Sequence, residues 1–295
     1  MSQLANVRPV SHGATNPVIR AWRPAVPGVV EAFHARFLEH AYPAHTHDAW
    51  ALLIIDDGAI QYDLHRHHHG AGRTTVTLLP PHVVHDGRPA GSGGFRKRVV
   101  YLDSTVLGED LIGAAVDVPA FDDELLRDRI HRLHLALLHR DDAFEAEGRL
   151  ALVRERLVDH LLADARRPRP RDSQSGRADA EIRTRPAKAR PDKAAELREL
   201  LDERVTAGMS LAEAAGILQA HPAHLVRSFT STFGMPPHAY FTGRRMDLAR
   251  RLLLAGERPA DVATAVGFYD QSHLTRHFKR YLGTSPARYA RFADR

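Results

Sequence analysis

The chain has 295 residues, of which 43% are hydrophobic and 26% charged. At about 100 to 200 residues per domain this length indicates two domains, and the composition is typical of a soluble globular protein. No cysteine is present, which excludes disulfide frameworks, thiolate metal sites, cysteine nucleophiles and thiol redox centres. The longest apolar run, AWALLII at 49–55, is far shorter than the roughly 20 residues of a membrane span, and no apolar signal segment is visible. We therefore expect a cytoplasmic protein that is neither secreted nor inserted in a membrane.

The net charge of +5 is unevenly distributed along the chain. Residues 193–295 carry 15 basic and 10 acidic side chains, and 164–192 carry 9 basic and 5 acidic ones. The first 163 residues hold 17 basic against 21 acidic side chains. This asymmetry indicates that the C-terminal part meets a polyanion, whereas the N-terminal part does not.

The first predicted elements are short β-strands within residues 18–103. The runs AWALLII, AIQYDLH, TTVTLLP and RKRVVYLD are rich in β-branched and aromatic residues, and turn residues at 56–58, 70–72, 80–81 and 91–94 separate them. This spacing predicts a small all-β barrel or sandwich.

Between residues 122 and 163 the apolar period changes to that of a helix. Two apolar stripes are separated by a break at 139–142, and they are formed by Leu126, Ile130, Leu133 and Leu137, and by Leu150, Val153, Leu157 and Leu161. Two amphipathic helices in this position either cover the β-domain or pair with a second subunit.

Residues 164–192 contain a single large aliphatic side chain, Ile182, among Arg, Pro, Ser, Gly and Asp. Such a segment buries too little apolar surface to offset its ordering entropy, which predicts a flexible basic linker. Its charge either serves solubility or adds weak attraction for phosphates. The predicted organisation is a domain at 1–163, a linker at 164–192 and a domain at 193–295.

The last hundred residues contain a repeat with an offset of 49. Residues 211–240 align on 260–289 through a shared pattern, H-L-x-R-x-F-x4-G-x2-P-x2-Y. Each copy predicts a short first helix, a turn, and a second helix at 221–233 or 270–282. Ser210 and Glu213 form a capping box before the first helix of copy one, and Gly234 and Gly283 are placed to end the second helices.

The outward side chains of the second helices distinguish a DNA-binding domain from a helical bundle with no such function. The inward Leu and Phe residues fit either interpretation. In copy two the outward positions are Gln271, Ser272, Thr275, Arg276 and Lys279, which are donors of the kind that reads base edges in the major groove. Eight basic residues accompany the two copies: Arg244, Arg245, Arg250, Arg251, Lys279, Arg280, Arg288 and Arg291. Their number favours binding to double-stranded DNA.

Two segments, GFYDQSHLTRHFKRYLGTSPARYAR at 267–291 and AHLVRSFTSTFG at 223–234, resemble the twin helix-turn-helix domain of the AraC/XylS family of transcriptional regulators. The resemblance covers about the last hundred residues. It implies an α+β multidomain protein with an N-terminal cupin-like β-barrel carrying two helices, a flexible linker, and a C-terminal all-α domain with two helix-turn-helix motifs.

The family resemblance also implies how DNA is contacted. A connecting helix at roughly 237–255 would hold two recognition helices about one DNA turn apart. Contacts would fall to Ala223, His224, Arg227 and Thr230 in copy one and to Gln271, Ser272, Thr275, Arg276 and Lys279 in copy two. Copy one departs from the family pattern at Pro222 and Ala223, where many members have larger or polar residues.

The N-terminal half is rich in histidine, with 20 histidines in the whole chain. His45 and His47, followed later by His85, match part of the spacing of a cupin metal site, but Ala51 or Leu52 stands where that site has a glutamate. We therefore favour histidines without a metal and predict no cofactor, while three imidazoles could hold Zn, Fe, Cu or Ni. The histidines at 65–69 predict a solvated hairpin tip.

The candidate ligand-binding residues are His45, His47, Trp50 and His85, and no catalytic residue is predicted. Tyr62 and Tyr101 could also line a pocket, although aromatic side chains on strands are more often core. The favoured function is a DNA-binding transcription regulator, not an enzyme, controlled by a small-molecule effector in the N-terminal domain. RNA polymerase and a second copy of the chain are expected partners. The alternatives are a cupin-type metal-dependent enzyme with a helical appendage and an architectural DNA binder without ligand control.

Overall fold

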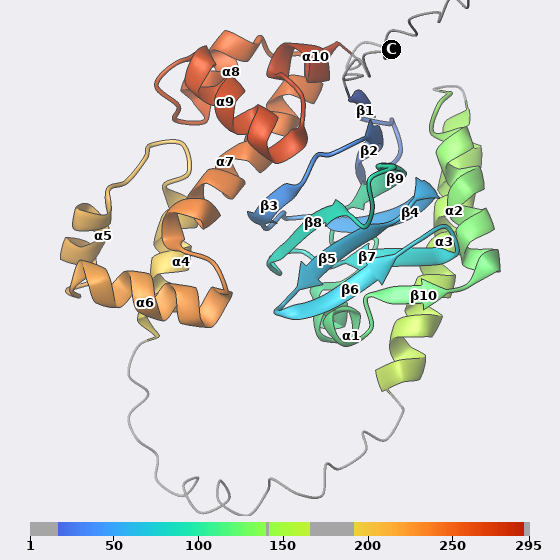
Figure 1. The fold of residues 1–295 in the computed structure, drawn as a ribbon, viewed down its shortest axis with the longest axis horizontal. Helices are drawn as coiled ribbons and strands as arrows, with labels where there is room; N and C mark the ends of the chain where they lie inside the picture. The colour runs from blue at the N-terminus through green and yellow to red at the C-terminus, as the bar shows by residue number, and fades with distance from the viewer. Residues whose placement is uncertain (1–16, 140–141, 166–191, 292–295) are drawn as a thin grey trace, which may run out of the picture.

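The computed structural model describes residues 17–139, 142–165 and 192–291, which form a β-rich N-terminal domain and a helical C-terminal domain (Figure 1). The strands are β1 (Val18–Trp22), β2 (Val29–Phe37), β3 (Tyr42–His45), β4 (Trp50–Gly58), β5 (Ile60–Leu64), β6 (His67–Ala71), β7 (Thr75–Leu79), β8 (His85–Pro89), β9 (Phe95–Leu102) and β10 (Ala120–Asp122). A short 3-10 helix (Glu109–Leu111) and α1 (Ile112–Asp117) precede β10, and α2 (Glu124–Ala136) and α3 (Ala143–Ala165) follow it.

The described strands form two antiparallel sheets rather than one closed hydrogen-bonded barrel. The larger sheet has the order β1-β2-β9-β4-β7-β10 and the smaller one β3-β8-β5-β6. Of the two architectures that the turn spacing allows, the structure has two facing sheets. Strands β3, β5 and β8 of the smaller sheet and β4, β7 and β9 of the larger one enclose a cavity.

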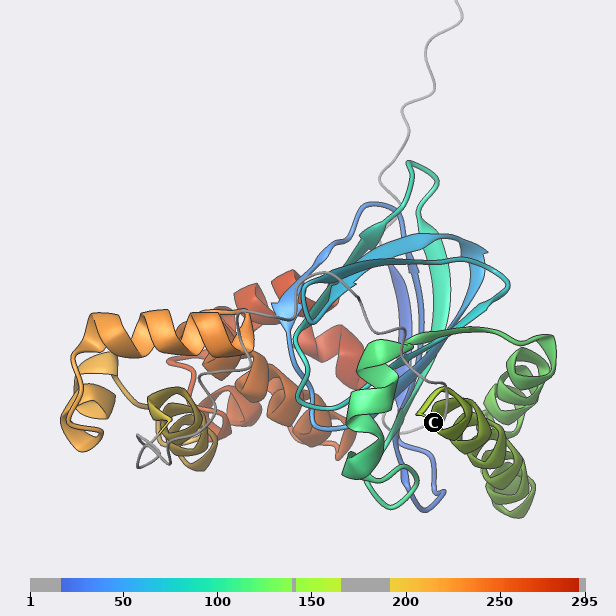
Figure 2. The same cartoon turned by 90° about the horizontal axis from the view of Figure 1, so that it is seen from below.

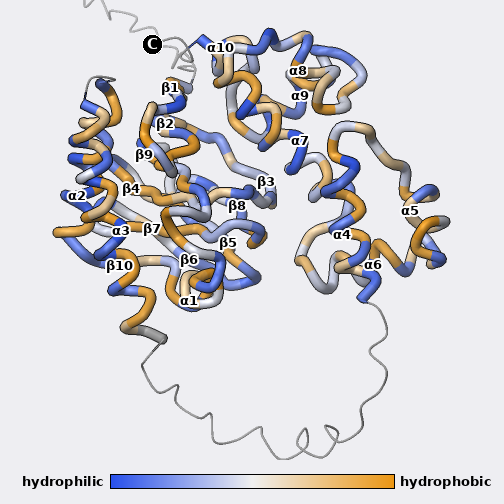
Figure 3. Tube along the Cα trace, turned by 180° about the vertical axis from the view of Figure 1, so that it is seen from behind, coloured by the Kyte–Doolittle hydropathy of each residue, from blue (hydrophilic) through white to orange (hydrophobic). Residues whose placement is uncertain are grey.

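The larger sheet is buried on both faces at β4. Trp50, Leu52 and Ile54 lie in the core beneath α2 and α3, whereas Ala51 and Leu53 point toward the smaller sheet. Successive side chains of a strand point to opposite faces, so a strand covered on both sides reads as a continuous apolar run. This explains the AWALLII segment, and Figure 3 shows β4 and β7 coloured as hydrophobic.

Helices α2 and α3 lie side by side on the outer face of the larger sheet, on the side away from the helical domain (Figure 2). All eight side chains of the two predicted apolar stripes are buried in that core. Asp123 caps α2 by accepting a hydrogen bond from the Leu126 N–H at 2.9 Å. The prediction that the stripes cover the β-domain is therefore confirmed.

The helical domain consists of α4 (Lys193–Glu203), α5 (Leu211–Ile217), α6 (Pro222–Phe233), α7 (Pro237–Leu254), α8 (Pro259–Ala265), α9 (Gln271–Leu282) and α10 (Pro286–Ala290). The pairs α5–α6 and α8–α9 are the two predicted helix-turn-helix units, and α7 connects them. The Ser210–Glu213 capping box is present. Gly234 and Gly283 end α6 and α9 in the left-handed conformation, with φ of +73° and +70°.

The histidine-rich hairpin turns earlier than expected. His65 and Arg66 form the turn between β5 and β6 with positive φ values of 45° and 72°, and His67 already belongs to β6. Residues 65–68 are exposed, as expected for a tip. The Arg66 guanidinium, however, donates a hydrogen bond to the carbonyl of Ser231 in α6, so the tip also contacts the helical domain.

The predicted linker lies outside the described residues except at its two ends. Helix α3 continues to Ala165, and Asp192 caps α4 by accepting a hydrogen bond from the Ala194 N–H. The domain boundaries at 163 and 193 thus stay predictions. Among the helices described, none has both the length and the apolarity needed to cross a bilayer.

The two domains share an apolar cluster and a buried ion pair. Side chains from inside the sheets, such as Phe37, belong to the same cluster as Met246 and Tyr289 of the helical domain. At its edge Arg250 of α7 donates to Glu31 of β2 at 2.8 Å, and the Tyr289 hydroxyl donates to the same carboxylate at 2.5 Å. Contacts across more than 200 residues of sequence therefore fix α7 against the larger sheet.

Candidate functional site

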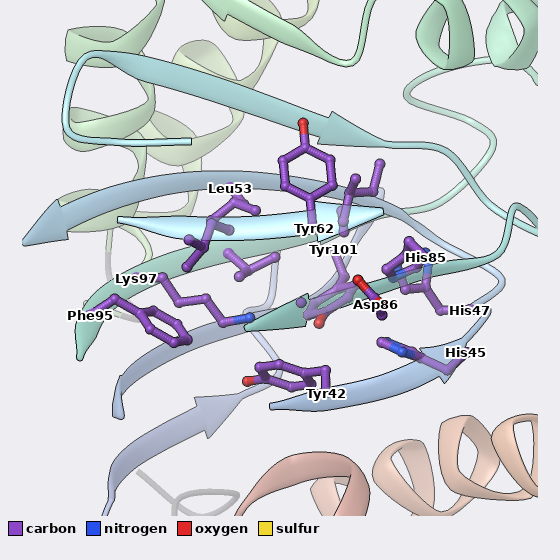
Figure 4. A pocket seen from close by; sticks show the side chains of 15 residues that line it. Tyr42, His45, His47, Leu53, Tyr62, His85, Asp86, Phe95, Lys97 and Tyr101 are labelled. Carbon is purple, nitrogen blue, oxygen red and sulfur yellow. The ribbon is translucent and has the colours of Figure 1, made fainter. Parts of the chain in front are cut away.

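A pocket lies between the two sheets and receives side chains from six strands (Figure 4). Its lining residues are Tyr42, His45, His47, Ala51, Leu53, Ile60, Tyr62, Leu79, His85, Asp86, Gly87, Phe95, Lys97, Val99 and Tyr101. Apolar and aromatic side chains predominate, with a few polar groups among them. This is the composition of a small-molecule site.

The structure brings together the three predicted histidines. The ring of His85 on β8 lies 4.4 Å from that of His45 and 4.6 Å from that of His47, measured between centroids. His45 on β3 and His85 are also cross-strand partners in the smaller sheet. The H-x-H spacing and the later histidine thus meet at one end of the pocket, although they are separated by about 40 residues of sequence.

Hydrogen bonds define the tautomers of two of these rings. His45 Nδ1 lies 2.8 Å from the carbonyl of Pro43, and His85 Nδ1 lies 2.9 Å from the carbonyl of Val83. Because a carbonyl oxygen only accepts, both rings carry their proton on Nδ1 and leave Nε2 as a lone-pair acceptor. Burial lowers the pKa of His85 to about 4 and those of His45 and His47 well below the usual value, so all three are neutral at pH 7.

Within residues 17–139, 142–165 and 192–291, no group of three or more histidine or acidic side chains is arranged to hold a metal ion. The position at which a cupin site has its glutamate is occupied by Ala51, which lines the pocket, and Leu52, which faces the opposite core.

Trp50 is not brought to this pocket. It is fully buried beneath α2 and α3, and its indole N–H donates to the carbonyl of Leu107 at 2.7 Å. The structure thus separates Trp50 from the other three candidate ligand-binding residues. Tyr62 and Tyr101, in contrast, do line the pocket.

Sequence reasoning missed Lys97, which extends from β9 into the pocket (Figure 4). Lys97, Val99 and Tyr101 alternate along one strand and must therefore share a face, but the sequence does not show that this face borders a cavity. Desolvation, followed by the charge of Arg250, lowers the pKa of Lys97 to about 7.

A second candidate site is the outward surface of the two helix-turn-helix units. In α6, His224 and Arg227 are exposed while Ala223 and Thr230 are partly buried. In α9, Gln271, Ser272, Arg276 and Lys279 are exposed and Thr275 is partly buried. Leu225, Phe229, Leu274 and Phe278 are buried on the opposite side of the two helices, as the repeat predicts.

Local contacts distinguish these candidate DNA-contacting residues. The Thr230 hydroxyl donates to the Val226 carbonyl at 2.7 Å within α6, so it has an internal partner. Arg227 and Arg276, at equivalent positions of the two repeats, make no ion pair within the described residues. Sequence reasoning did not single out Tyr269, which is 92% exposed just before the α9 cap at Asp270.

Three of the four α7 arginines, Arg244, Arg245 and Arg250, are engaged within the molecule, so their number is weaker evidence for DNA binding than the sequence suggests. Arg250 is buried against Glu31, and Arg244 pairs with Asp48 of the β-rich domain and with Asp202. The guanidinium of Arg245 lies 4.4 Å from the centre of the Phe241 ring. These cations are used inside the molecule.

Comparison with known families gives one match for each domain. Residues 27–153 match the family described as AraC-like ligand binding domain, and residues 198–291 match a helix-turn-helix domain family. The HTH-type transcriptional regulator YbfI of Bacillus subtilis is 24% identical over 83% of this chain and 86% of its own. The probable transcriptional regulator LumQ of Photobacterium leiognathi is 31% identical over 31% of this chain and 38% of its own.

Solved structures share the fold over nearly the whole chain. Apo ToxT from Vibrio cholerae has a TM-score of 0.56 and 13% identity, and the similarity covers 94% of this chain and 97% of ToxT. Wild-type ToxT with an unsaturated fatty acid bound has a TM-score of 0.55 and 14% identity, covering 94% and 95%. At this identity the likeness establishes the fold alone.

The buried histidines predict a loss of stability in mild acid. The folded-state pKa of His34, His40 and His85 is about 4, against about 6.5 in the unfolded chain. Each contributes stability that is present above pH 6.5 and is lost as the pH falls toward 4, at up to about 1.4 kcal/mol per pH unit. We expect the urea concentration at the unfolding midpoint to decrease as the pH is lowered from 7.5 to 5.0. Unfolding is monitored by the fluorescence of Trp22 and Trp50, which both lie in the β-rich domain.

The matched variants are His85→Gln and His139→Gln. The slope of the unfolding free energy against pH gives the number of protons taken up on unfolding. His85→Gln should reduce this number by about one, whereas His139→Gln, at an exposed position, should leave it unchanged. A midpoint that is constant between pH 7.5 and 5.0 would contradict the assignment of neutral buried rings.

Proposed function

The chain belongs to the AraC/XylS family of transcriptional regulators, and on this premise we propose that it reads DNA with α6 and α9 under the control of an effector bound between its sheets. Its relatives are DNA-binding transcriptional regulators, a family that is not enzymatic, so the metal-dependent enzyme alternative has no support. The observation that carries the proposal is the duplicated helix-turn-helix unit with polar side chains on its outward surface.

Sequence readout is assigned to the exposed positions of α6 and α9. Arg227 and Arg276 occupy the same place in the two repeats, and a bidentate arginine–guanine contact is the commonest specific pairing. Gln271, Ser272 and Thr275 add shorter donors and acceptors at the start of α9, while His224 and Lys279 are suited to phosphate. Ala223 and Thr230 would contribute van der Waals contact with bases or sugars.

Effector control is supported by Tyr101, a residue that lines the pocket and also contacts the helical domain. Tyr101 lines the cavity, and the guanidinium of Arg250 lies 4.3 Å from the centre of its ring. Arg250 belongs to α7, the helix that connects the two DNA-reading units. An effector that moves Tyr101 therefore alters the contact that holds α7, which is a physical route from pocket to DNA.

A homodimer is proposed through α2 and α3. These helices expose large apolar side chains on the side away from the sheet: Leu125, Leu135, Phe144, Leu152 and Leu162. Phe144 is 90% exposed. Exposed apolar side chains gathered on two adjacent helices are typical of an interaction surface. RNA polymerase is a further proposed partner, and the cytoplasm is the proposed location, because both follow from action at a promoter.

The first prediction concerns the reading residues. Selection of bound sequences from random duplex DNA by the full chain should yield two conserved blocks about 10 base pairs apart. At fixed salt, Arg227→Ala and Arg276→Ala should each weaken binding to the selected sequence by about 5- to 150-fold, the equivalent of about 1 to 3 kcal/mol. Affinities are measured by fluorescence anisotropy.

Arg258→Ala is the matched control for both variants. Arg258 is exposed on the same domain, but its guanidinium is already paired with Asp261 through two hydrogen bonds. Unchanged affinity in both the Arg227 and Arg276 variants would show that the reading surface lies elsewhere on the domain.

The second prediction concerns the contact between the domains. Arg250→Met removes one partner of a buried pair and leaves the Glu31 charge uncompensated, which costs about 3 to 5 kcal/mol. Because the domains can separate and hydrate Glu31, we expect a larger radius of gyration in small-angle X-ray scattering. The double variant Glu31→Leu/Arg250→Met should recover the compact form. An unchanged radius in Arg250→Met would contradict the role of this pair.

The third prediction concerns the apolar surface of α2 and α3. Leu152→Glu should convert a dimer into a monomer in sedimentation velocity, because a carboxylate would be buried at the interface. Leu211→Glu changes a leucine of comparable exposure on α5 and should leave the dimer intact. A single-chain mass for the unmodified protein would contradict the proposed dimer.

A further inference from the structure

Lys97 places a positive charge in the pocket that is not neutralised by any carboxylate of the described residues. Its ammonium lies 4.1 Å from the centre of the Tyr42 ring and 5.8 Å from that of Phe33. No salt bridge to Lys97 exists among residues 17–139, 142–165 and 192–291. Burial removes much of the water that would stabilise such an ammonium, and no described carboxylate replaces that water as a counter-ion.

The two carboxylates nearest to the pocket are engaged elsewhere. Glu31 accepts hydrogen bonds from Arg250 and Tyr289. Asp86 lines the pocket, but its Oδ1 accepts from the backbone N–H of Asp63 at 2.8 Å and lies 3.8 Å from Arg88. Arg250, the other cation near the pocket, is paired with Glu31, so Lys97 supplies the uncompensated charge.

Other groups around the cavity also lack partners. The Tyr42 hydroxyl and His47 Nε2 are buried and have no hydrogen-bond partner in the described part of the chain. The His45 and His85 rings are neutral, so they neither repel an anion strongly nor neutralise one. The remaining wall is apolar and includes Leu53, Leu79 and Phe95.

We propose that this pocket binds a short-chain aliphatic monocarboxylate whose carboxylate pairs with the Lys97 ammonium and whose hydrocarbon end lies against the apolar wall. The Tyr42 hydroxyl is placed to donate a hydrogen bond to the same carboxylate. This inference rests on the proposed function, because it names the chemical class of the effector for the pocket already described.

Charge and size both restrict the ligand class. One lysine without an arginine or a group of converging backbone N–H donors suits a monoanion, whereas a phosphate dianion needs more donors. The cavity has a volume of about 40 Å³, which is room for about three water molecules. An acid of three or four carbons occupies a comparable space. The desolvated Lys97, with its pKa near 7, would regain its full charge beside a carboxylate.

The test uses the full chain and compares butyrate with butyramide, its uncharged analogue of the same shape. Binding is measured by isothermal titration calorimetry and by the melting temperature followed through the two tryptophans. We expect butyrate to bind and to raise the melting temperature, and butyramide to bind at least tenfold more weakly. Lys97→Met should lower butyrate affinity at least tenfold, whereas Lys193→Met, a surface lysine paired with Glu196, should retain it.

Three results would overturn the proposal: equal binding of butyrate and butyramide, retained affinity in Lys97→Met, or no butyrate binding by the unmodified chain. Binding of decanoate without binding of butyrate would also overturn the short-chain assignment. Without ligand, Lys97→Met should melt no lower than the unmodified chain, because the change removes a buried charge without a counter-ion. A lower melting temperature would contradict the idea that this ammonium awaits an anion.

DNA binding separates failure of this inference from failure of the proposed function. The unmodified chain is therefore also tested for binding to the selected DNA when no carboxylate is present. If it binds this DNA but does not bind butyrate, the ligand class is wrong and the regulator proposal stands. If the unmodified chain selects no DNA sequence, the proposed function itself fails.

Discussion

The double burial of the six-stranded sheet is the constraint on which the rest of the structure depends. A strand has only two faces, so the buried residues of β4 and β9 serve either the core under α2 and α3 or the cavity beneath the smaller sheet. A shift of one residue in register would exchange Trp50 with Ala51 and remove Lys97 and Tyr101 from the pocket. The pocket between the sheets is thus specified by the same packing that stabilises the domain.

A buried ion pair ties this sheet to the DNA-reading domain. Glu31 and Tyr101 are cross-strand partners on β2 and β9, and Arg250 contacts both of them. Hydrophobic residues of similar volume can often match the stability of a buried ion pair. Hydrophobic residues, however, pack acceptably in several relative positions of the two domains. The ion pair is satisfied only when α7 lies in one position against the sheet, because only there do the two charges meet. The pair therefore suits a contact between domains that must form in one arrangement or not form at all.

Sequence periodicity was sufficient for the elements whose structure is determined locally. The stripes of α2 and α3, the caps at Ser210 and Gly283, and the duplicated helix-turn-helix units follow from spacing alone. The β10 strand and α1 are too short to carry a detectable period.

Residues whose roles depend on distant contacts could not be placed from the sequence. In the sequence Arg250 is one of several basic residues, and only the fold brings it beside Glu31, 219 positions earlier. Lys97 stands between Arg96 and Arg98, and a run of three cations is typical of a solvated strand. Only the pairing of β9 with β2 and β4 shows that its middle member points into a cavity. The side of the sheet on which Trp50 lies could not be predicted for the same reason, and its neighbour Ala51 is the residue that lines the pocket.

The position of α7 is the physical basis of the proposed regulation. Helix α7 contacts α6 and the neighbouring α4 on the side of the first unit, α8, α9 and the neighbouring α10 on the side of the second, and β3 of the β-rich domain. Major-groove segments on one DNA face recur about every 34 Å, so α6 and α9 bind together only if α7 holds them at the matching separation and angle. Tyr101 is in direct contact with Arg250, and Arg250 belongs to α7, the helix that sets the spacing of α6 and α9. A small movement of Tyr101 therefore changes this geometry through a single contact.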